Sequence, residues 1–413
     1  QDEKERIVLE RLYKVILARR MRKLLYLAPN SVHTTHEAAS AAADVTERLM
    51  LDGQKLAWHM DRVQAWERGE RIAPITIDMA LTRACNASCW FCYAQLQESQ
   101  ERKYLDTEVM RGFLDDCAEI GVRAVSLVSD GESTLSPAFE FTVQYGRSLG
   151  IDMACGTNGW ILTPDKAGGV LPHLTYLRFN VSAGTPKRYA EIMGLKEEDF
   201  HRVTANIRHM VEEKRTNDYP VTLGLQMVYE PRDQDQLLPF AQLAVDLGVD
   251  YAVIKHTSDD ERGSLGVRYD KYKETYPVLR QAEALTTAQT QIHVKWSKIG
   301  DEGRREYARC FGPPFILQIS GSGLVAPCGM LFGAKYSKFH IGNIAEERFK
   351  SIWASDRYWD VMNYLASDKF DARRMCGALC LQHRVNDALD KHIKKFVPLT
   401  AATGSSPAHV NFL

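Results

Sequence analysis

The sequence lacks the features that direct a chain into a membrane or onto a polyanion. It has no uninterrupted run of about 18 apolar residues, the length that a membrane-spanning helix needs. Residues 1–25 contain neither the apolar core nor the small-residue cleavage site of a signal peptide. The 52 Lys and Arg residues nearly cancel the 53 Asp and Glu residues, so no net field favours nucleic acid or an anionic bilayer. We therefore expect a cytoplasmic protein that binds neither nucleic acid nor membranes.

The first part of the chain has little strand signal, and the whole chain lacks internal repeats and low-complexity tracts. Residues 45–67 place apolar side chains at helical spacing, and Gly69 and Pro74 then interrupt the pattern. We therefore expect an N-terminal helical extension over residues 1–73.

From Pro74 onward, short apolar runs alternate with amphipathic segments. Met110, Phe113 and Cys117 recur at helical spacing between the first two runs, which predicts a helix there. This alternation predicts an α/β fold built of parallel βα units, a partial (β/α)6 barrel of the TIM type over residues 74–260. Barrels of this kind carry their chemistry at the C-terminal ends of the strands. The expected strands are Ile75–Leu81, Ala124–Ser129, Ile151–Cys155, Tyr176–Ser182, Val221–Tyr229 and Tyr251–His256.

The alternation weakens beyond residue 260. Phe315–Ser320 and Leu324–Ala326 read as two short strands of a hairpin, and residues 344–366 return to helical spacing. We expect a small C-terminal α+β domain over residues 261–399. A linker rich in Thr, Gly and Ser then opens a tail over residues 400–413.

Nine cysteines are many for such a chain, and seven of them fall in two groups. In a reducing compartment, grouped cysteines favour metal ligation over disulfides. The first group is Cys85, Cys89 and Cys92, in C-x3-C-x2-C spacing after the first predicted strand. A [4Fe–4S] cluster normally takes four thiolates, so three would leave one iron open to a further ligand. The alternative, a zinc knuckle, needs a fourth Cys or His nearby, and none is present.

The spacing of this first group, with the aromatic Phe91 before its last cysteine, resembles the radical SAM (S-adenosylmethionine) superfamily. Three further strand ends agree with that resemblance, which implies a SAM pocket. Asp130–Thr134 resembles the segment that receives the SAM ammonium, although Asp130 and Ser133 replace the usual Gly and Pro. The residues that the resemblance implies as cofactor-binding are Phe91 against the adenine, Gly131, Glu132 as ammonium acceptor, Ser133, Asn158, Ser182 and Gln226.

The second group of cysteines flanks the predicted hairpin and resembles the SPASM/twitch extension of the same superfamily. The resemblance implies one auxiliary [4Fe–4S] cluster, and a structural zinc on the same thiolates is the alternative. The four cysteines are Cys310, Cys328, Cys376 and Cys380.

The resemblance implies reductive cleavage of SAM to a 5′-deoxyadenosyl radical, which takes a hydrogen atom from an unactivated substrate carbon. It also implies a reducing partner such as flavodoxin or ferredoxin. The substrate that we favour is a ribosomally made peptide of natural-product biosynthesis, cross-linked, epimerised or shortened by residue excision. Since residues 1–73 lack strands, a separate protein could bind the leader peptide. The alternatives are oxidation or epimerisation of a sugar or aminocyclitol and, in another class, a non-enzymatic iron–sulfur or zinc scaffold.

A few polar residues at strand ends stay open to two interpretations. Cys155 could donate a hydrogen atom to a substrate radical, as thiols do in radical epimerases, or could be a small buried apolar side chain. Lys255 and His256 end the sixth strand and could contact substrate, or be a solvated lysine and a satisfied core histidine. Arg178 and Asn180 share one face of the fourth strand and could line the barrel interior.

Overall fold

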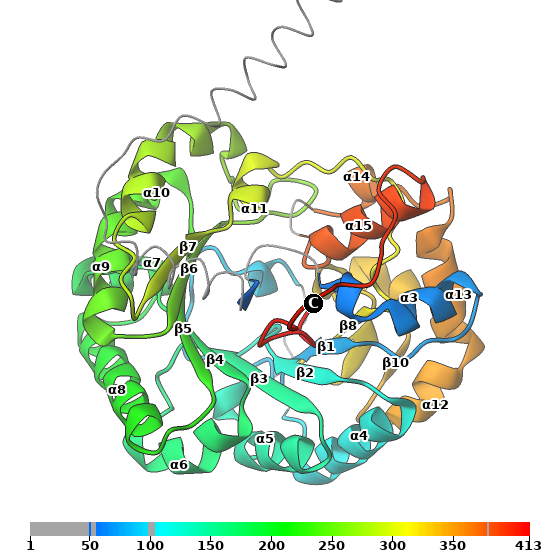
Figure 1. The fold of residues 1–413 in the computed structure, drawn as a ribbon, viewed down its shortest axis with the longest axis horizontal. Coiled ribbons are helices and arrows are strands. Elements are labelled where there is room, and N and C mark those ends of the chain that lie inside the picture. Colours follow the sequence, from blue (N-terminus) through cyan, green and yellow to red (C-terminus); the bar gives the residue numbers. More distant parts are fainter. Residues whose placement is uncertain (1–48, 51–54, 98–103, 378–379) are drawn as a thin grey trace, which may run out of the picture. The chain divides into compact units, whose positions relative to one another are not determined.

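The computed structural model describes residues 49–50, 55–97, 104–377 and 380–413, and these residues form one continuous sheet surrounded by helices (Figure 1). The predicted helices of residues 1–48 lie outside the described residues. The sheet has ten strands in the order β10-β9-β8-β1-β2-β3-β4-β5-β6-β7. The strands are β1 Thr76–Met79, β2 Ala124–Leu127, β3 Asp152–Thr157, β4 Tyr176–Asn180, β5 Thr222–Tyr229, β6 Tyr251–His256, β7 Gln291–Val294, β8 Ile316–Ile319, β9 Leu324–Ala326 and β10 Gly342–Asn343.

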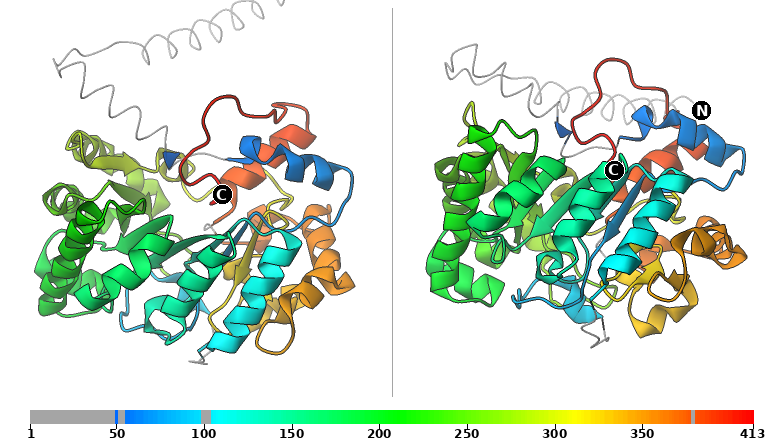
Figure 2. Two further views of the ribbon diagram at one scale, coloured as in Figure 1. Left: turned by 60° about the horizontal axis from the view of Figure 1, so that its bottom comes forward. Right: turned by 90° about the horizontal axis from the view of Figure 1, so that it is seen from below.

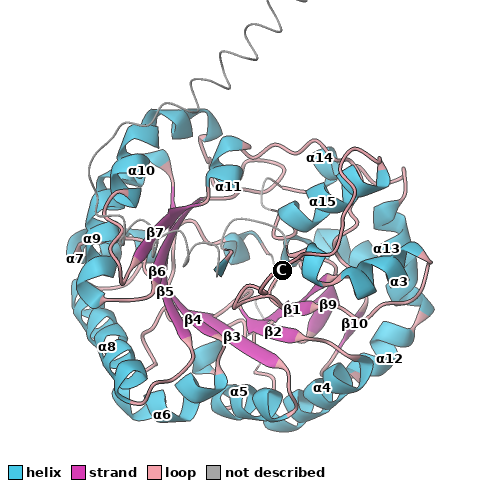
Figure 3. Cartoon of the chain, in the orientation of Figure 1, coloured by secondary structure: helices cyan, strands magenta, loops and turns pink. Residues whose placement is uncertain are grey.

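Helices cover the outer side of the curved sheet, as Figure 3 shows for α4, α5, α6, α8, α9 and α10. The described α-helices are α3 Met60–Glu67, α4 Thr107–Ile120, α5 Phe139–Ser148, α6 Ala167–Val170, α7 Pro186–Met193, α8 Glu197–Thr216, α9 Leu237–Leu247, α10 Tyr276–Glu283, α11 Trp296–Gly300, α12 Phe349–Ala354, α13 Asp356–Ala366, α14 Ala372–Met375 and α15 His383–Ile393.

The parallel barrel predicted from the sequence is confirmed, since all six expected strands form and β1 to β7 pair in parallel. Local signals also work as expected for α4. Asp106 caps its first turn by accepting a hydrogen bond from the Val109 N–H at 2.9 Å, and Gly121 ends it with φ of 89°.

The structure differs from the expectation at both edges of the barrel. β7 adds a seventh parallel strand, and the first strand of the predicted hairpin, β8, pairs in parallel with β1. β9 then pairs antiparallel with β8, as the hairpin prediction requires. The sheet therefore runs without a break across the predicted boundary at residue 260, because β8 belongs to the hairpin and to the barrel sheet at once.

Alternation along the strands separates a helix-facing side from the barrel interior. Met153 on β3 packs against Gly146 of α5, where an added Cβ would lie 2.4 Å from the Met153 Sδ. Ala154, the next residue, clusters instead with Tyr176 and Phe412. Because paired residues share a face, the register aligns the interior residues of neighbouring strands.

The last residues of the described chain pack against the N-terminal ends of the strands (Figure 2). Thr76, the first residue of β1, donates to the Asn411 carbonyl at 2.7 Å, and the Phe412 ring lies edge-on to Tyr176 at 5.0 Å. The buried Lys55 ammonium donates to the His409 and Phe412 carbonyls, both at 2.8 Å. Residues 407–413 therefore close the N-terminal side of the barrel.

A buried carboxylate joins three segments at the opposite end of the strands. Asp130 follows β2, accepts from the Ser320 hydroxyl at 2.6 Å and from the Gly321 N–H at 2.9 Å, and pairs with the Arg83 guanidinium at 3.1 Å. The Asp130 side chain is 0% exposed and that of Arg83 9% exposed. Asp130, which stands where the family usually has glycine, thus links the loop after β1 to the β8–β9 hairpin.

We predict that Asp130→Ala lowers the free energy of unfolding by about 3–5 kcal/mol, because it leaves the Arg83 cation buried without its partner. Chemical denaturation monitored by circular dichroism measures the change. Asp356→Ala is the matched control, since the Asp356–Arg71 pair is exposed and should contribute less than about 1 kcal/mol. Equal losses in the two variants would show that the Asp130 contacts do not stabilise the fold.

We also predict that Lys55→Met releases the tail at a cost of about 1–3 kcal/mol, since two buried carbonyls lose their donor. Limited digestion with proteinase K should then cut faster within the mostly exposed segment of residues 400–406. The exposed Lys187→Met variant should be cut at the wild-type rate. Wild-type resistance of the Lys55→Met protein would mean that apolar packing alone holds the tail.

Candidate functional site

The loop carrying the first cysteine group lies at the C-terminal side of the barrel and is held by the end of α7. The Ser88 N–H donates to the Met193 carbonyl at 3.1 Å, and the Trp90 N–H donates to the Ile192 carbonyl at 3.3 Å. Gly194 ends α7 with φ of 61°, and a Cβ there would lie 2.2 Å from the Ser88 Oγ. The absence of a side chain at this position lets the loop seat against the helix.

The three thiols of this loop are close enough to influence one another electrostatically. Burial, with smaller contributions from the charges of Glu132 and Cys92, raises the pKa of Cys85 to about 11, although Cys85 is the most exposed of the three. Burial, then the neighbouring Cys92 and Cys85 charges, raises the pKa of Cys89 well above its usual value. Three such thiolates need positive charge to offset their desolvation. Three iron atoms of a cubane would supply it, so the donor set fits a cluster with one open iron.

The loop after β2 lies directly against this cysteine loop. Gly131 has φ of 144°, and a Cβ on it would lie 2.0 Å from the Thr82 carbonyl oxygen. The Glu132 N–H donates to the Ala84 carbonyl at 2.9 Å, and the Ser133 hydroxyl accepts from the Leu81 N–H at 3.2 Å. The close approach explains why the position requires glycine.

Glu132 is buried at the meeting point of three strand ends. Its Oε1 accepts from the Thr134 N–H and hydroxyl at 3.2 and 2.6 Å and from the Thr157 hydroxyl at 2.8 Å. Its Oε2 accepts from the Asn158 N–H at 2.7 Å. Burial raises the pKa of this carboxyl group, and these donors oppose the rise by favouring the ionised form. Oε2 retains a lone pair for one further donor.

The remaining predicted cofactor residues surround the same region. The Asn158 side-chain amide donates to the Asn86 side-chain amide oxygen, Oδ1, in the cysteine loop at 2.7 Å. Ser182 is buried and its hydroxyl accepts from the Val228 N–H at 3.2 Å, while the Gln226 amide donates to Asn180 at 2.8 Å. Phe91 is almost buried, edge-on to Trp90 at 6.0 Å. The structure thus brings the loops after β1, β2 and β3 into contact, and it places Ser182 just after β4 and Gln226 on β5.

The second cysteine group lines one cavity near β8 and α15. The charges of Cys380, Cys376 and Cys328 each raise the pKa of the Cys310 thiol, after the larger effect of burial. The cavity walls are otherwise largely apolar, and they include Met330, Leu365 and Phe370. Four thiols that line one cavity match the donor set of a complete cluster. Among the described residues, no three His, Cys, Asp or Glu side chains are grouped to hold a single metal ion, whereas a cubane spreads its thiolates over separate corners.

Three polar residues beside these thiols had no motif to mark them in the sequence. The Tyr307 hydroxyl donates to the Cys380 sulfur at 3.2 Å, and the Asn386 amide donates to the Cys310 sulfur at 3.5 Å. The Arg305 guanidinium donates to the Gly377 carbonyl and interacts electrostatically with Cys380, Cys376 and Cys310. Such contacts lower the cost of burying thiolates and tune the reduction potential of a bound cluster.

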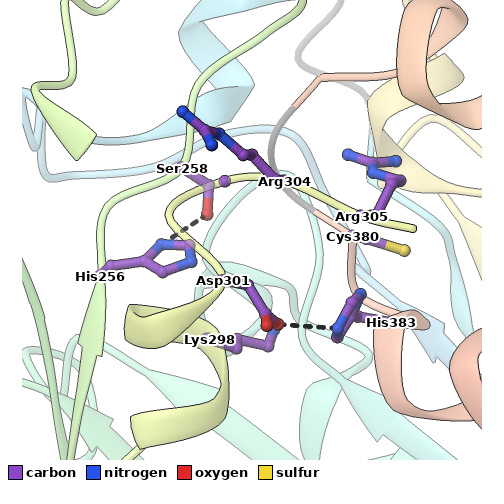
Figure 4. Close-up of a pocket in the computed structure, with 9 residues that line it drawn as sticks. His256, Ser258, Lys298, Asp301, Arg304, Arg305, Cys380 and His383 are labelled. Atoms are coloured by element: carbon purple, nitrogen blue, oxygen red, sulfur yellow. Dashed lines mark hydrogen bonds and ion pairs between the residues drawn. The ribbon is translucent and has the colours of Figure 1, made fainter. Parts of the chain in front are cut away.

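A further cavity reaches from β6 to the second cysteine group (Figure 4). His256 at the end of β6 and Lys298 on α11 lie on one side, and Arg305 and Cys380 on the other. The Asp301 carboxylate pairs with His383 at 2.8 Å within it. The structure therefore provides a polar path from the end of β6 toward the second cysteine group.

Cys155 lies apart from both cysteine groups. It is fully buried in the main hydrophobic cluster and shares its strand face with Met153, which packs on α5. It therefore faces the helices rather than the barrel interior. The hydrogen-donor role stays a prediction, and this placement does not support it.

Two family models match two separate regions of the chain, one in the barrel and one around the C-terminal cysteines. The family model of the radical SAM superfamily matches residues 79–237, and that of the SPASM iron-sulfur cluster-binding domain matches residues 310–380. The chain is 24% identical to the AdoMet-dependent heme synthase of Methanosarcina barkeri, over 68% of this chain and 82% of that protein. It is 22% identical to the mycofactocin maturase MftC of Mycolicibacterium smegmatis, over 70% and 72%.

Among solved structures, Streptococcus suis SuiB bound to its precursor peptide SuiA aligns with a TM-score of 0.56 at 14% identity, over 99% of this chain and 90% of SuiB. At that identity the likeness shows the fold. Within the described residues, no helix has the length and apolar character that crossing a membrane requires. The two family matches and the shared fold show that this chain belongs to the radical SAM superfamily, as an enzyme that uses SAM, a SAM-binding [4Fe–4S] cluster and an auxiliary iron–sulfur cluster in a SPASM domain.

Proposed function

We propose that this enzyme modifies a ribosomally synthesised peptide by removing a hydrogen atom from an unactivated carbon. The observation that carries the radical part is the contact between the cysteine loop and the buried Glu132 at the C-terminal side of the barrel. The peptide part draws support from the relatives, since MftC is a maturase and SuiB has been solved with a precursor peptide. Oxidation or epimerisation of a sugar or aminocyclitol is the second candidate.

The chain's residues divide the work of binding and orientation. Cys85, Cys89 and Cys92 would hold the SAM-binding cluster. Its chemistry is the one-electron cleavage of SAM to methionine and a 5′-deoxyadenosyl radical, with the electron drawn from a flavodoxin- or ferredoxin-like partner. The remaining SAM contacts would be Phe91 against the adenine, the loop of Gly131, Glu132 and Ser133 at the ammonium, and Asn158, Ser182 and Gln226 along the ribose and carboxylate.

Glu132 is suited to receive the SAM ammonium. The hydrogen bonds from Thr134, Thr157 and Asn158 fix its carboxylate and leave Oε2 able to accept one charged donor. A charge-assisted hydrogen bond in a buried place is among the stronger polar contacts that a protein can offer. The neighbouring Asn158 side chain ties this carboxylate to the cysteine loop through Asn86.

A cluster on the C-terminal cysteines would affect whether the substrate is oxidised or epimerised. Cys310, Cys328, Cys376 and Cys380 would ligate the auxiliary cluster, and Arg305 beside them favours the extra negative charge of a reduced cluster. Because Cys155 faces the helices, oxidation or bond cleavage with electron transfer to this cluster has more support here than thiol-mediated epimerisation.

Metal content tests both cysteine groups. We predict about eight irons per chain after anaerobic reconstitution, since seven cysteines suit two cubane clusters. Replacing Cys85, Cys89 and Cys92 together by Ala should leave about four irons and abolish 5′-deoxyadenosine formation. Iron and zinc are measured by plasma mass spectrometry. About four irons with one zinc in the wild-type protein would remove the auxiliary-cluster assignment.

Substitution of Glu132 tests the SAM pocket. We predict that Glu132→Gln weakens SAM binding about tenfold or more, because the ammonium loses a charge-assisted partner. Equilibrium titration of the reconstituted enzyme with SAM measures the affinity, and the exposed Glu212→Gln variant should match the wild type. Unchanged affinity in the Glu132 variant would show that the ammonium binds elsewhere.

Cys155→Ala separates redox-neutral from oxidative chemistry. From its placement we predict that this variant keeps product formation and takes up no solvent deuterium at the altered carbon. A peptide encoded beside the gene is the first substrate to assay, with product followed by mass spectrometry. A variant that still forms 5′-deoxyadenosine but no product would restore the donor role. If sugars but no peptides accelerate 5′-deoxyadenosine formation, the second candidate function replaces the first.

A further inference from the structure

Charged side chains line the interior of the barrel below the SAM-binding loops. Register places Asp78 of β1 beside Gln318 of β8, and Arg178 of β4 beside Gly224 of β5 and Tyr251 of β6. Lys255 lies on the same face of β6 as Tyr251, four residues further along. The three charged side chains, Asp78, Arg178 and Lys255, are half-buried, and Arg178 and Tyr251 line a cavity inside the barrel.

The contacts of the Arg178 guanidinium are mainly with aromatic residues, Tyr176 and Tyr251. Its guanidinium lies 5.6 Å from the centre of the Tyr176 ring and interacts with the Tyr251 hydroxyl. Its Nε has no hydrogen-bond partner among the described residues. Gly224 makes room for this arrangement, since a Cβ there would lie 2.3 Å from the Tyr251 ring. The guanidinium therefore retains a donor for another group.

Lys255 is in a similar position two layers above. Its ammonium makes no hydrogen bond or ion pair with the described residues, and it experiences the positive charges of Arg178, Lys298 and Lys295. Burial, reinforced by these cations, lowers the pKa of Lys255 well below its usual value. A buried cation without an anion is costly, so this cluster would be stabilised by a negatively charged group between its members.

Among the described residues, few acidic side chains act on both Arg178 and Lys255. Asp78 is the acidic residue that acts on both Arg178 and Lys255, and its carboxylate already accepts from the Gln318 amide at 3.3 Å. Burial raises the pKa of Asp78 to about 7, so that near neutral pH this carboxyl group is ionised only in part. The nearby acid therefore compensates the guanidinium of Arg178 only in part, and no hydrogen bond within the described residues joins the Lys255 amine to a carboxylate.

We propose that an oxyanion of the substrate, a carboxylate or a phosphate, binds inside the barrel between Arg178 and Lys255. This inference rests on the proposed function, for which it narrows the substrate class. His256, the next residue of β6, points to the opposite face of the strand from Lys255. Lys298 provides the link, because its charge acts on Lys255 and it lines both the cavity that contains Arg178 and the cavity leading to Cys380 (Figure 4). One layer above Arg178 on the same face, Asn180 bonds the Gln226 amide of the expected SAM pocket. An anion held here would fix one end of the substrate between the SAM side and the auxiliary-cluster side.

The test is calorimetric titration of the anaerobically reconstituted enzyme with sodium acetate and, separately, inorganic phosphate, each with and without SAM. We expect one anion to bind per chain. Lys255→Met and Arg178→Gln should each raise the dissociation constant about tenfold or more, the equivalent of one charge-assisted hydrogen bond. Lys255→Arg, which keeps the charge, should retain most of the affinity, and the exposed Lys187→Met variant should behave as wild type.

The arms of the experiment separate the possible results. Preference for phosphate assigns a phosphorylated substrate, and preference for acetate assigns a carboxylate. If neither anion binds, or if Lys255→Met and Arg178→Gln bind both as the wild type does, the inference is overturned. The SAM affinity of the same samples tests the proposed function separately. The anion titrations without SAM test the anion site even if SAM does not bind.

Discussion

The structure depends on one buried ionic contact, that of the Asp130 carboxylate with Arg83, Ser320 and Gly321. Arg83 stands two residues before Cys85, and Asp130 two residues before Glu132. Ser320 and Gly321 open the hairpin that leads to Cys328. A carboxylate removed from water must find donors on every side, so the three segments cannot move independently without exposing or orphaning it. The Asp130 side chain therefore contacts the cluster loop, the SAM loop and the SPASM hairpin at once.

What the sequence predicts correctly here is encoded locally. The six strands follow from short apolar runs, and α4 follows from its apolar spacing, its Asp106 cap and its terminal Gly121. The pairing of β8 with β1 could not be predicted, because it joins residues about 240 positions apart and the hairpin pattern of β8 and β9 is the same with or without it. The orientation of Cys155 was also open, because alternation gives two faces and only the contact of Met153 with α5 shows which is which.

In the candidate sites, too, some residues are marked by a sequence motif and others are found only from the structure. The cysteine spacing marks the candidate cluster ligands, and the segment around Glu132 marks a candidate SAM contact. Both can be seen in the sequence because residues that act from one loop must keep a fixed spacing. Arg305, Tyr307 and Asn386 surround the C-terminal thiols from separate elements and have no shared motif. The sequence shows Asp130 as a departure from the family pattern, but its role depends on contacts with Arg83 and Ser320 that only the structure shows. Supporting contacts of this kind depend on tertiary structure, and a single sequence carries no period or spacing that reveals them.

The hydrogen bonds that converge on Glu132 have a consequence for the entropy of cofactor binding. A flexible carboxylate must give up its rotamers when it captures a cation, and that loss subtracts from the affinity. At Glu132 the fold has already restricted the side chain, since Thr134, Thr157 and Asn158 hold both oxygens before any ligand arrives. The free energy gained from an incoming charged donor is then spent on affinity and orientation rather than on ordering the protein, so the carboxylate is preorganised for its partner.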